Sequence, residues 1–471
     1  MFRRAPATGG LLRDEKDSLG VRQIPEEAYW GAQTSRAIEN YPISGERAHP
    51  EMIRAYARIK RACARVNGDL GRLPADKARA IVQACDEILA GKLLDQFVVD
   101  VYQAGAGTSF HMNVNEVVGG RASEILGKAR GDRSAVNPND DVNLGQSTND
   151  TFPTALHLAV IAVGRPLAAE VGRLAESFAR KGEEFAGIVK SGRTHLMDAV
   201  PVTLGQEFRA FGAAIARRSA ALSTALDGLR ELALGGTAAG TGLNTPAGFR
   251  EKAVALLAEA TGESLTPAAD PREALQSRAA AGDYSSAMRA FAVELGRIAN
   301  DLRLLASGPA TGLDEIRLPA VQPGSSIMPG KVNPSLLECL NMLCFQIVGF
   351  DTANQLAVGG GQLDLNVMMP LLAHNLTRGP ELLLHFLPVV RTRCVDGITA
   401  NREKCRDYVE QSPSVVTALT PKIGYAKAAE IFKEAVARDV LVRDVLLEKK
   451  IVTAEELEAA LSRETLLGPL D

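Results

Sequence analysis

The sequence of 471 residues has only six cysteines, and none of them stands in a C-x-x-C pair. This spacing favours neither a zinc site nor a disulfide framework, so buried and reduced thiols are expected. An excess of one charge is also lacking, because 53 Lys and Arg residues stand against 56 Asp and Glu residues and the formal net charge is −3. A nucleic-acid or anionic-membrane partner would need a basic excess, so neither is expected. The cysteines are Cys63, Cys85, Cys339, Cys344, Cys394 and Cys405.

Long apolar runs are scarce as well. The longest, such as residues 158–164, break at Arg165, well short of a membrane span. Residues 1–20 carry Arg3 and Arg4 but not the apolar core of a secretion signal. The sequence has no phosphate-loop spacing, no dinucleotide fingerprint and no cluster of metal-ligand residues. A soluble cytoplasmic protein that needs no cofactor and no metal is therefore expected.

Helical periodicity, in contrast, is abundant in the middle of the chain. One heptad seam runs without a break over about 30 Å of helix, at ~1.5 Å per residue. Its members are Tyr284, Met288, Phe291, Leu295, Ile298, Leu302 and Leu305. A second seam, interrupted at Lys181, comprises Leu167, Val171, Leu174, Phe178, Phe185 and Val189. Such seams indicate a mainly α protein with a long helical bundle, which either lies within one chain or forms the core of an oligomer.

Local signals mark the ends of several predicted helices. Asp270, Pro271 and Glu273 have the pattern of a helix start, with a cap, a first-turn proline and a box acid. Residues 307–309, Ser-Gly-Pro, have the pattern of a helix stop. Residues 453–456 have the spacing of a capping box. These signals predict helix boundaries on both sides of the unbroken seam and a short helix near the C-terminus.

The chain divides by character into three predicted domains. Residues 1–148 are expected to form a mainly helical N-terminal domain, with extended structure only around residues 22–24. Residues 149–403 contain the long seams and are expected to form the central bundle. Residues 404–471 contain short charged helices and are expected to form a small C-terminal domain without visible chemistry.

The segments between the predicted helices are dense in Gly, Ser, Thr and Asn. They span residues 105–115, 137–150, 192–198, 235–244 and 324–334. In the last of them, Gly324 and Gly330 allow close backbone approach, and two serines between them offer hydroxyl and N–H groups to an anion. Lys331 adds a positive charge and Asn333 adds an amide. From these features alone the segment is either an anion-binding loop or a flexible loop with a surface lysine.

Residues 324–334, with the sequence GSSIMPGKVNP, resemble the signature of the aspartase/fumarase superfamily. Four further segments resemble the same family, so the likeness extends over nearly the whole chain. They span residues 28–34, 145–154, 192–199 and 235–244. The resemblance implies a mainly α, three-domain fold whose central bundle assembles into a tetrameric helix core. It also implies a small dicarboxylate substrate and active sites that are shared among three subunits of a homotetramer.

The resemblance further implies an elimination reaction. A base removes a proton from the carbon next to a carboxylate, the group on the neighbouring carbon leaves, and the intermediate is an aci-carboxylate. Because this proton is weakly acidic, the site must stabilise charge that develops on carboxylate oxygens, and hydroxyl and amide donors suit that task. By resemblance Ser325 is the base, and its alkoxide would need backbone N–H groups and a cation such as Lys331 nearby.

The family motifs assign roles to the remaining site residues. Those that hold the carboxylate on which charge builds are Thr108, Ser147 and Thr148. Those near the leaving group are Asn149, Thr194 and His195, of which His195 either orients the substrate or moves a proton. Those that bind the other carboxylate are Lys331 and Asn333. Ser326 adds a donor to the same pocket, and Glu338 matches an acid that orients His195.

Three other polar residues are given structural interpretations. His111 stands where relatives commonly carry another polar residue, and it is interpreted as a tolerated departure close to the predicted carboxylate site. Asp198 and Glu207 could pair as acid and base. No sequence feature indicates a raised pKa for either, so Asp198 is predicted to be a cap and Glu207 an ordinary helix residue.

The finer motifs favour aspartate over malate as substrate. Residues 99–109 and 362–368 resemble aspartases, and residues 137–140 lack the histidine that begins the secondary anion site of fumarases. Residues 196–198 and 423–425 instead resemble fumarases. The prediction is an ammonia-lyase that makes fumarate, with a class II fumarate hydratase as the alternative. A non-enzymatic structural role and an elimination on argininosuccinate or adenylosuccinate are weaker alternatives.

Overall fold

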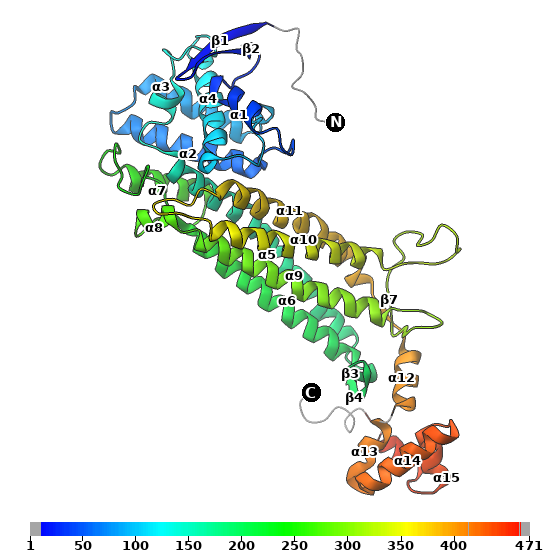
Figure 1. Cartoon of the computed structure of the whole chain (residues 1–471). Coiled ribbons are helices and arrows are strands. Elements are labelled where there is room, and N and C mark those ends of the chain that lie inside the picture. Colours follow the sequence, from blue (N-terminus) through cyan, green and yellow to red (C-terminus); the bar gives the residue numbers. More distant parts are fainter. Residues whose placement is uncertain (1–10, 413, 461, 463–471) are drawn as a thin grey trace. The chain divides into compact units, whose positions relative to one another are not determined.

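The computed structural model describes residues 11–412, 414–460 and 462, and it is 63% helical (Figure 1). The mainly α fold class predicted from the seams is therefore confirmed. The described residues form two compact units, each assembled from separate stretches of the chain. The first contains residues up to 168, 220–290 and 346–383, and the second contains residues 169–219, 291–345 and those from 384 onward. The three consecutive domains expected from the sequence stay a prediction. Residues 1–10, which include Arg3 and Arg4, lie outside the described residues.

The first unit begins with an antiparallel hairpin, β1 (Leu12–Asp17) and β2 (Gly20–Pro25), which confirms the extended structure expected around residues 22–24. Four helices follow it: α1 (Ala32–Asn40), α2 (Pro50–Asp69), α3 (Ala75–Leu89) and α4 (Thr108–Ile125). Helix α2 begins at a proline, and the His49 Nδ1 atom accepts a hydrogen bond from the Glu51 N–H at 3.1 Å. A single π-helical turn, Pro138–Val142, precedes the first long helix.

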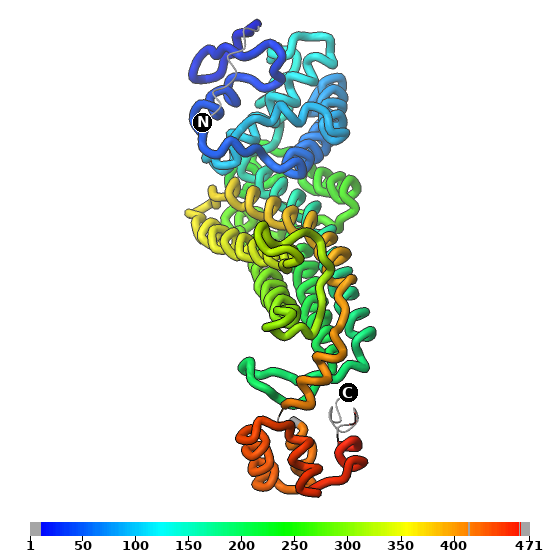
Figure 2. The backbone as a smooth tube through the Cα atoms, turned by 90° about the vertical axis from the view of Figure 1, so that its right-hand side faces the viewer, coloured from blue at the N-terminus to red at the C-terminus, as the bar shows by residue number. Residues whose placement is uncertain are grey.

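The rest of the first unit contains helices and one short parallel ladder. The complete elements are β5 (Glu231–Leu232), α7 (Phe249–Thr261), β6 (Thr266–Pro267) and α8 (Pro271–Gln276). The unit also includes parts of α5 (Thr148–Glu184), α9 (Ala279–Leu305), α10 (Ser335–Val358) and α11 (Met369–Arg393). Residues of α10 and α11 lie side by side in this unit (Figure 2), where the Asn375 amide donates to Asn354 Oδ1 at 2.9 Å.

The unbroken seam lies on α9, and all seven of its side chains are at most 8% exposed. This confirms that the seam is the buried face of a long helix. The helix ends at Leu305, directly before the predicted stop at residues 307–309. The predicted start is also confirmed, because the Asp270 carboxylate accepts a hydrogen bond from the Arg272 N–H at 2.9 Å. That cap begins the six-residue helix α8, which is separated from α9 by residues 277–278.

The second predicted seam is correct only to the end of α5, at Glu184. Its interruption, Lys181, is buried and donates from Nζ to the Ile398 carbonyl at 2.9 Å. Beyond the helix, β3 (Val189–Thr194) and β4 (Met197–Thr203) form an antiparallel hairpin, so the helical assignment of Val189 was wrong. The strand gives no hydrophobic alternation because three polar or small residues at its centre, 190–192, are all buried.

The second unit also contains part of α6 (Leu204–Asp227). In the same unit β7 (Ile316–Arg317) pairs with β8 (Thr399–Ala400) in a short antiparallel ladder. The C-terminal helices are α12 (Arg402–Gln411), α13 (Ser414–Ile423), α14 (Tyr425–Arg438), α15 (Val442–Glu448) and α16 (Ala454–Ala460). Helices α13 to α16 enclose a small apolar core of their own. The predicted capping box is confirmed, because Thr453 Oγ1 accepts from the Glu456 N–H at 3.1 Å and the Glu456 carboxylate accepts from the Thr453 N–H at 3.0 Å.

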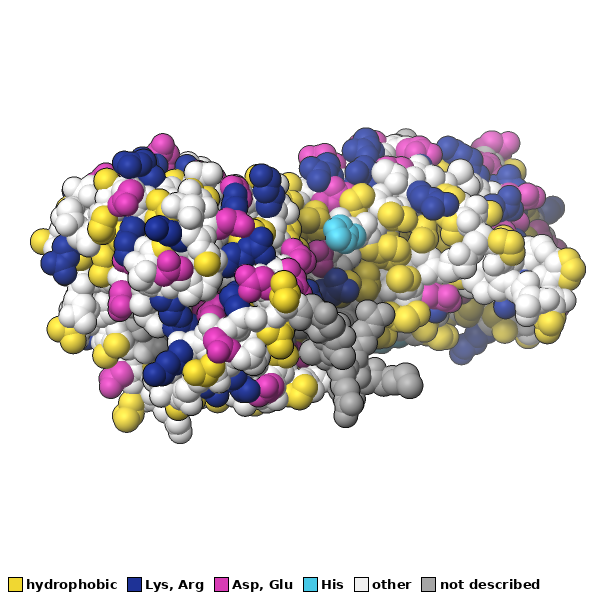
Figure 3. Space-filling view, turned by 90° about the horizontal axis from the view of Figure 1, so that it is seen from above, with side chains coloured by type: hydrophobic (Ala, Val, Ile, Leu, Met, Phe, Trp, Pro, Cys, Tyr) yellow, Lys and Arg dark blue, Asp and Glu magenta, His cyan; other side chains and the backbone are white. Residues whose placement is uncertain are grey.

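The surface and the thiols agree with the composition. On the face shown in Figure 3, Lys and Arg side chains are interspersed with Asp and Glu side chains, and apolar side chains gather between them. All six cysteines are free, and five of them are buried, whereas Cys339 is half-buried. The expectation of buried thiols is therefore confirmed for every cysteine except Cys339.

Candidate active site

Two long helices of the first unit begin at neighbouring threonines. Thr108 is the first residue of α4 and Thr148 the first residue of α5, and their Oγ1 atoms lie 3.1 Å apart. The chain reaches Thr108 through a left-handed turn, in which Gly107 has φ +92°. A Cβ atom at Gly107 would lie 2.1 Å from the Phe152 ring, so only glycine fits there. The predicted loop 105–115 is in fact a three-residue turn, because α4 already begins at Thr108.

The turn before α5 places Ser147 and Asn149 beside Thr148. Ser147 Oγ accepts a hydrogen bond from the Asn149 N–H at 3.2 Å, and the Asn149 amide donates to the Ala238 carbonyl at 2.8 Å. The loop of residues 235–244 is thereby attached to the start of α5. The structure thus brings together four residues predicted to bind the substrate: Thr108, Ser147, Thr148 and Asn149.

Asp150 is the fully buried residue that joins these segments. Its carboxylate accepts hydrogen bonds from the backbone N–H groups of Ser147, Gly235 and Thr237 at 2.9, 2.9 and 3.0 Å. Burial raises the pKa of Asp150 to about 6, while the three N–H donors act in the opposite direction. Asp150 therefore positions two loops of the site without facing solvent.

Two buried residues that lie behind Thr148 were not assigned to the site from the sequence. His111 Nδ1 lies 2.7 Å from Thr148 Oγ1, and His111 Nε2 lies 2.7 Å from the Nζ atom of Lys60. The sequence motifs did not predict any role for Lys60. The only available signal was its position on α2, where a lysine stands among the buried residues Ile59 and Ala62.

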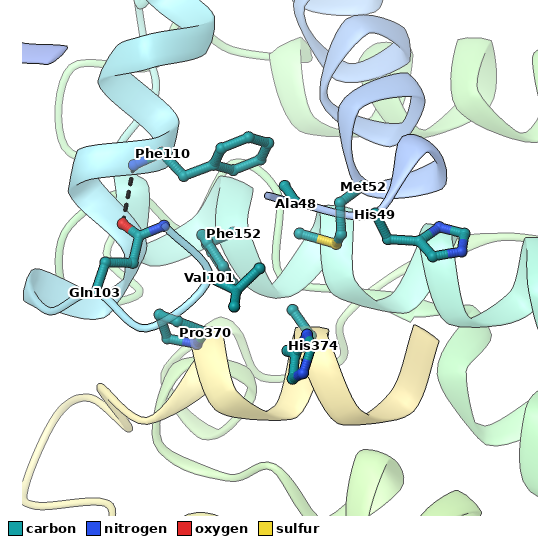
Figure 4. A pocket seen from close by; sticks show the side chains of 10 residues that line it. Ala48, His49, Met52, Val101, Gln103, Phe110, Phe152, Pro370 and His374 are labelled. Atoms are coloured by element: carbon teal, nitrogen blue, oxygen red, sulfur yellow. Dashed lines mark hydrogen bonds between the residues drawn. The ribbon is translucent and has the colours of Figure 1, made fainter. Parts of the chain in front are cut away.

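A small cavity lies beside this cluster, between residues that precede α4 and the start of α11 (Figure 4). The Gln103 side chain accepts a hydrogen bond from the Phe110 N–H at 2.9 Å and so holds the preceding loop to the helix. The cavity has a volume of about 20 Å³ and a mainly apolar lining, so it has room for a water molecule and not for a four-carbon dicarboxylate.

In the second unit, residues 324–334 form a closed loop. The Gly324 N–H donates to the Lys331 carbonyl at 2.7 Å, and the Asn333 amide donates to the Gly324 carbonyl at 2.6 Å. A Cβ atom at Gly324 would lie 2.5 Å from the backbone nitrogen of Asn333, so glycine is required for this closure. Ser326 follows Ser325 in the loop, and Lys331 is exposed at its end.

The Ser325 hydroxyl accepts two hydrogen bonds from the backbone of its own loop. Its Oγ atom accepts hydrogen bonds from the backbone N–H groups of Ile327 at 3.2 Å and Met328 at 2.9 Å. N–H donors that point at an oxygen stabilise its deprotonated form. The backbone thus supplies the donors that a serine base requires, and this property cannot be read from the residue types alone.

The β3–β4 hairpin carries Thr194 and His195 at its exposed tip. His195 and Leu196 have φ values of +58° and +60°, as in a two-residue hairpin turn of type I′. The hairpin is anchored by Glu315, whose side chain is fully buried and forms ion pairs with Lys190 at 3.0 Å and Arg193 at 2.8 Å.

Of the two structural predictions made for Glu207 and Asp198, the first is confirmed and the second is wrong. Glu207 lies on α6, as predicted, where it accepts a hydrogen bond from Lys190 at 2.8 Å and where burial raises its pKa. Asp198 lies exposed within β4, so its prediction as a helix cap was wrong. The error follows from the missed hairpin.

Glu338 lies in the first turn of α10 and forms an ion pair with Arg303 at 3.7 Å. Within the described part of the chain, no hydrogen bond or ion pair joins Glu338 to His195. The role of Glu338 in orienting His195 stays a prediction.

Comparisons with known proteins agree with this architecture. A family model described as Lyase matches residues 20–349, and one described as Fumarase C C-terminus matches residues 415–468. A class II fumarate hydratase of Ralstonia nicotianae is 46% identical over 457 residues, which cover 97% of this chain and 99% of that protein. An aspartate ammonia-lyase of Corynebacterium glutamicum is 46% identical over 462 residues, which cover 98% of this chain and 88% of that protein.

Solved structures show the same fold. A Brucella melitensis protein, described as fumarate lyase:delta crystallin bound to cobalt, matches with a TM-score of 0.92 and 47% identity over 96% of this chain and 98% of that chain. A class II fumarase from Schistosoma mansoni matches with a TM-score of 0.92 and 37% identity over 98% of this chain and all of that chain. These likenesses define a lyase with the mainly α fold of fumarases and aspartases. The chain belongs to the aspartase/fumarase superfamily, as its motifs predicted.

Proposed function

We propose that this lyase is an aspartate ammonia-lyase, which eliminates ammonia from L-aspartate to give fumarate, with Ser325 as the base. The observation that carries the assignment of the base is the pair of backbone N–H groups at the Ser325 hydroxyl, at 2.9 and 3.2 Å. In the proposed reaction Ser325 takes the proton from the carbon next to a carboxylate. The electron pair left behind forms the aci-carboxylate, and ammonia then leaves from the neighbouring carbon.

The carboxylate on which charge builds is proposed to bind at the threonine pair. Thr108 and Thr148 offer hydroxyl groups 3.1 Å apart at the N-termini of two long helices, where backbone dipoles favour an anion. Ser147 adds a third hydroxyl. Donors fixed in advance at developing charge are the main source of stabilisation in such eliminations. Lys331 and Asn333 are proposed to hold the other carboxylate, and Asn149, Thr194 and His195 to surround the leaving group.

Ammonia is favoured over water as the leaving group by the motifs around the threonine pair and by Asn137. In fumarases a histidine begins a secondary anion site in this segment. Here the Asn137 side chain instead accepts hydrogen bonds from the N–H groups of Asn139 at 2.8 Å and Asp140 at 3.2 Å, and so caps the π-helical turn. An uncharged amide whose oxygen caps this turn does not supply the positive charge of a histidine.

A class II fumarate hydratase is the second candidate, favoured by the fumarase-like residues 196–198 and by the relative from Ralstonia nicotianae. Purified protein incubated separately with L-aspartate and L-malate, with fumarate followed by its absorbance, tests the choice. Fumarate from aspartate is expected. Fumarate from malate alone would replace the ammonia-lyase assignment by the hydratase.

We also propose that the protein is a cytoplasmic homotetramer with each active site shared among three chains. Helices α5 and α10 are long and apolar enough to cross a membrane by length and composition, but 72% of the apolar window of α5 is buried, as in a core helix. The window of α10 is only 33% buried, and its exposed side chains include Met342 and Phe345 at 64% and 66%. An apolar stripe of this kind on a bundle helix fits contact with another chain.

A further inference from the structure

A chain of close polar contacts leads from the core of the first unit to the threonine pair. Lys60 on α2 and His111 on α4 are both at most 1% exposed. The contacts run from Lys60 Nζ to His111 Nε2 at 2.7 Å, from His111 Nδ1 to Thr148 Oγ1 at 2.7 Å, and from Thr148 Oγ1 to Thr108 Oγ1 at 3.1 Å. Three separate helices thus contribute to one continuous line of donors and acceptors.

The direction of each hydrogen bond follows from the first residue in the line. Besides His111, Lys60 Nζ donates to Asn143 Oδ1 at 3.1 Å and Gln146 Oε1 at 2.8 Å. Both amides are held with their oxygens toward Lys60, because the Asn143 NH₂ group donates to the Gln146 carbonyl and the Gln146 NH₂ group donates to the carbonyls of Val142 and Leu144. Burial lowers the pKa of Lys60 to about 7, and below that pH its ammonium group has three hydrogens that meet these three acceptors, so His111 Nε2 accepts one of them.

An imidazole that accepts at Nε2 carries its hydrogen on Nδ1 and donates it to Thr148. Burial, followed by the charge of Lys60, lowers the pKa of His111 well below its usual range, which keeps the ring neutral. The ring of Tyr56 stacks on the imidazole at 5.4 Å with an interplanar angle of 22°, and this contact fixes the ring plane. His111 is therefore held in one tautomer and one orientation.

The consequence concerns the threonine hydroxyls. Because Thr148 Oγ1 accepts from His111, its single hydrogen is directed away from His111, toward Thr108 and the exposed side of the pair. The Thr108 hydroxyl in turn donates to the Gly105 carbonyl at 2.6 Å when no ligand competes. Resting on the proposed function, we propose that His111 is a positioning residue that presents the Thr148 and Thr108 hydroxyls as donors to the substrate carboxylate.

The test measures binding of succinate, a saturated four-carbon dicarboxylate without a leaving group, by calorimetry on the full-length protein at pH 6, below the pKa of about 7 of Lys60. His111→Leu removes the donor to Thr148 and is expected to weaken succinate binding about tenfold, the usual effect of one lost hydrogen bond to a charged group. His111→Asn can still donate from the position of Nδ1, and it is expected to recover most of the affinity. Met112→Leu, a buried change on the same helix, is the matched control and is expected to stay within about twofold of wild type.

A double-mutant cycle separates positioning from a general effect on folding. Thr148→Val removes the hydroxyl through which His111 is proposed to act, so His111→Leu should have no further effect on succinate affinity in that background. The inference would be overturned if the losses of succinate affinity were additive, or if His111→Asn bound succinate as weakly as His111→Leu. Either result, with an active wild type, would leave the proposed function intact. A wild-type protein that neither binds succinate nor forms fumarate from aspartate or malate would overturn both.

Discussion

At the scale of single residues, backbone geometry supports the proposed role of Ser325. A serine is a weak base, and the two N–H groups of the loop of residues 324–334 that point at Oγ would stabilise its deprotonated form. The loop keeps this form because the Asn333 amide and the Lys331 carbonyl close it at Gly324. The side chains of Ile327 and Met328 point outward and are exposed, so the loop contributes little to the core.

Replacing Ser325 by alanine is therefore expected to remove activity without unfolding the protein. A positioned proton-transfer group typically contributes about 10²–10⁴-fold to the rate, and the turnover of Ser325→Ala should fall by at least this range. Fumarate absorbance measures the rate, and thermal unfolding followed by circular dichroism checks the fold. Ser134→Ala, at an exposed turn serine that donates to Asp132, is the control and should retain full activity. Undiminished turnover of Ser325→Ala would reject Ser325 as the base.

At the scale of secondary-structure elements, two buried carboxylates position the loops that carry the site. Asp150 joins the start of α5 to residues 235–237, and Glu315 joins the β3–β4 hairpin to the segment before β7. Both carboxylates are fully buried; Asp150 accepts hydrogen bonds from Gly235 and Thr237, and Glu315 forms ion pairs with Lys190 and Arg193. A buried charge held in this way specifies one arrangement, because any other arrangement leaves the charge unpaired.

Asp150 predicts a pH dependence of stability with a definite sign. Because its pKa is raised from 3.8 to about 6, the folded chain binds this proton more tightly than the unfolded chain. The contribution of Asp150 to the free energy of unfolding is therefore full below pH 3.8 and is lost as the pH rises through 6, a change on the order of 3 kcal/mol.

Denaturant unfolding of wild type and Asp150→Asn at a series of pH values measures this effect. The stability advantage of wild type over Asp150→Asn should shrink between about pH 4 and 6. Asp132 serves as a control of opposite sign, because hydrogen bonds from Ser134 lower its pKa. The advantage of wild type over Asp132→Asn should instead grow as the pH rises from the lowered pKa to 3.8, and it should change little between about pH 4 and 6. A pH-independent difference for Asp150→Asn would contradict the assignment.

Glu315→Gln is expected to destabilise the hairpin and its site residues together. Removing the buried charge of Glu315 leaves Arg193 without its carboxylate partner and Lys190 with Glu207 alone, and the loss of one member of a buried ion pair costs about 3–5 kcal/mol. Glu39→Gln breaks the partly exposed pair with Arg22 and should cost less than about 1 kcal/mol. Denaturant midpoints give the stabilities, and fumarate formation reports on Thr194 and His195. Equal midpoints for the two variants would show that the network does not anchor the hairpin.

At the scale of the whole molecule, the apolar side chains that one chain leaves exposed on α10 fit the proposed homotetramer. Met342 and Phe345 lie one turn apart on the same face, and both are about two-thirds exposed. A monomer gains nothing from this exposure, whereas a homo-oligomer buries it.

Phe345→Asp is therefore expected to lower the assembled mass measured by light scattering and to lower activity with it, because shared sites would come apart. Val436→Asp is a matched control, since Val436 is an apolar side chain that is 65% exposed on α14 and not on α10. That variant should keep the wild-type mass and rate. A wild-type protein that is monomeric in solution would contradict both the tetramer and the composite site.

Several features could be predicted because they depend on local chemistry. The buried face of α9, its end at Leu305 and the capping box at Thr453 all follow from periodicity and from side chains that bond within a few residues. The β3–β4 hairpin could not be predicted, because the burial of Lys190 depends on Glu315, 125 positions later in the sequence. The helical extension to Val189 failed for the same reason.

The sequence by itself determined the family, the mainly α architecture and the residue types of the site, since motifs and helical periodicity are properties of neighbouring residues. Only the tertiary structure decided what those residues experience. It directed two backbone N–H groups at Ser325 and enclosed Lys60 and His111 behind Thr148. Hydrogen-bond direction, burial and the resulting pKa values arise from contacts between distant segments, and no local pattern encodes them.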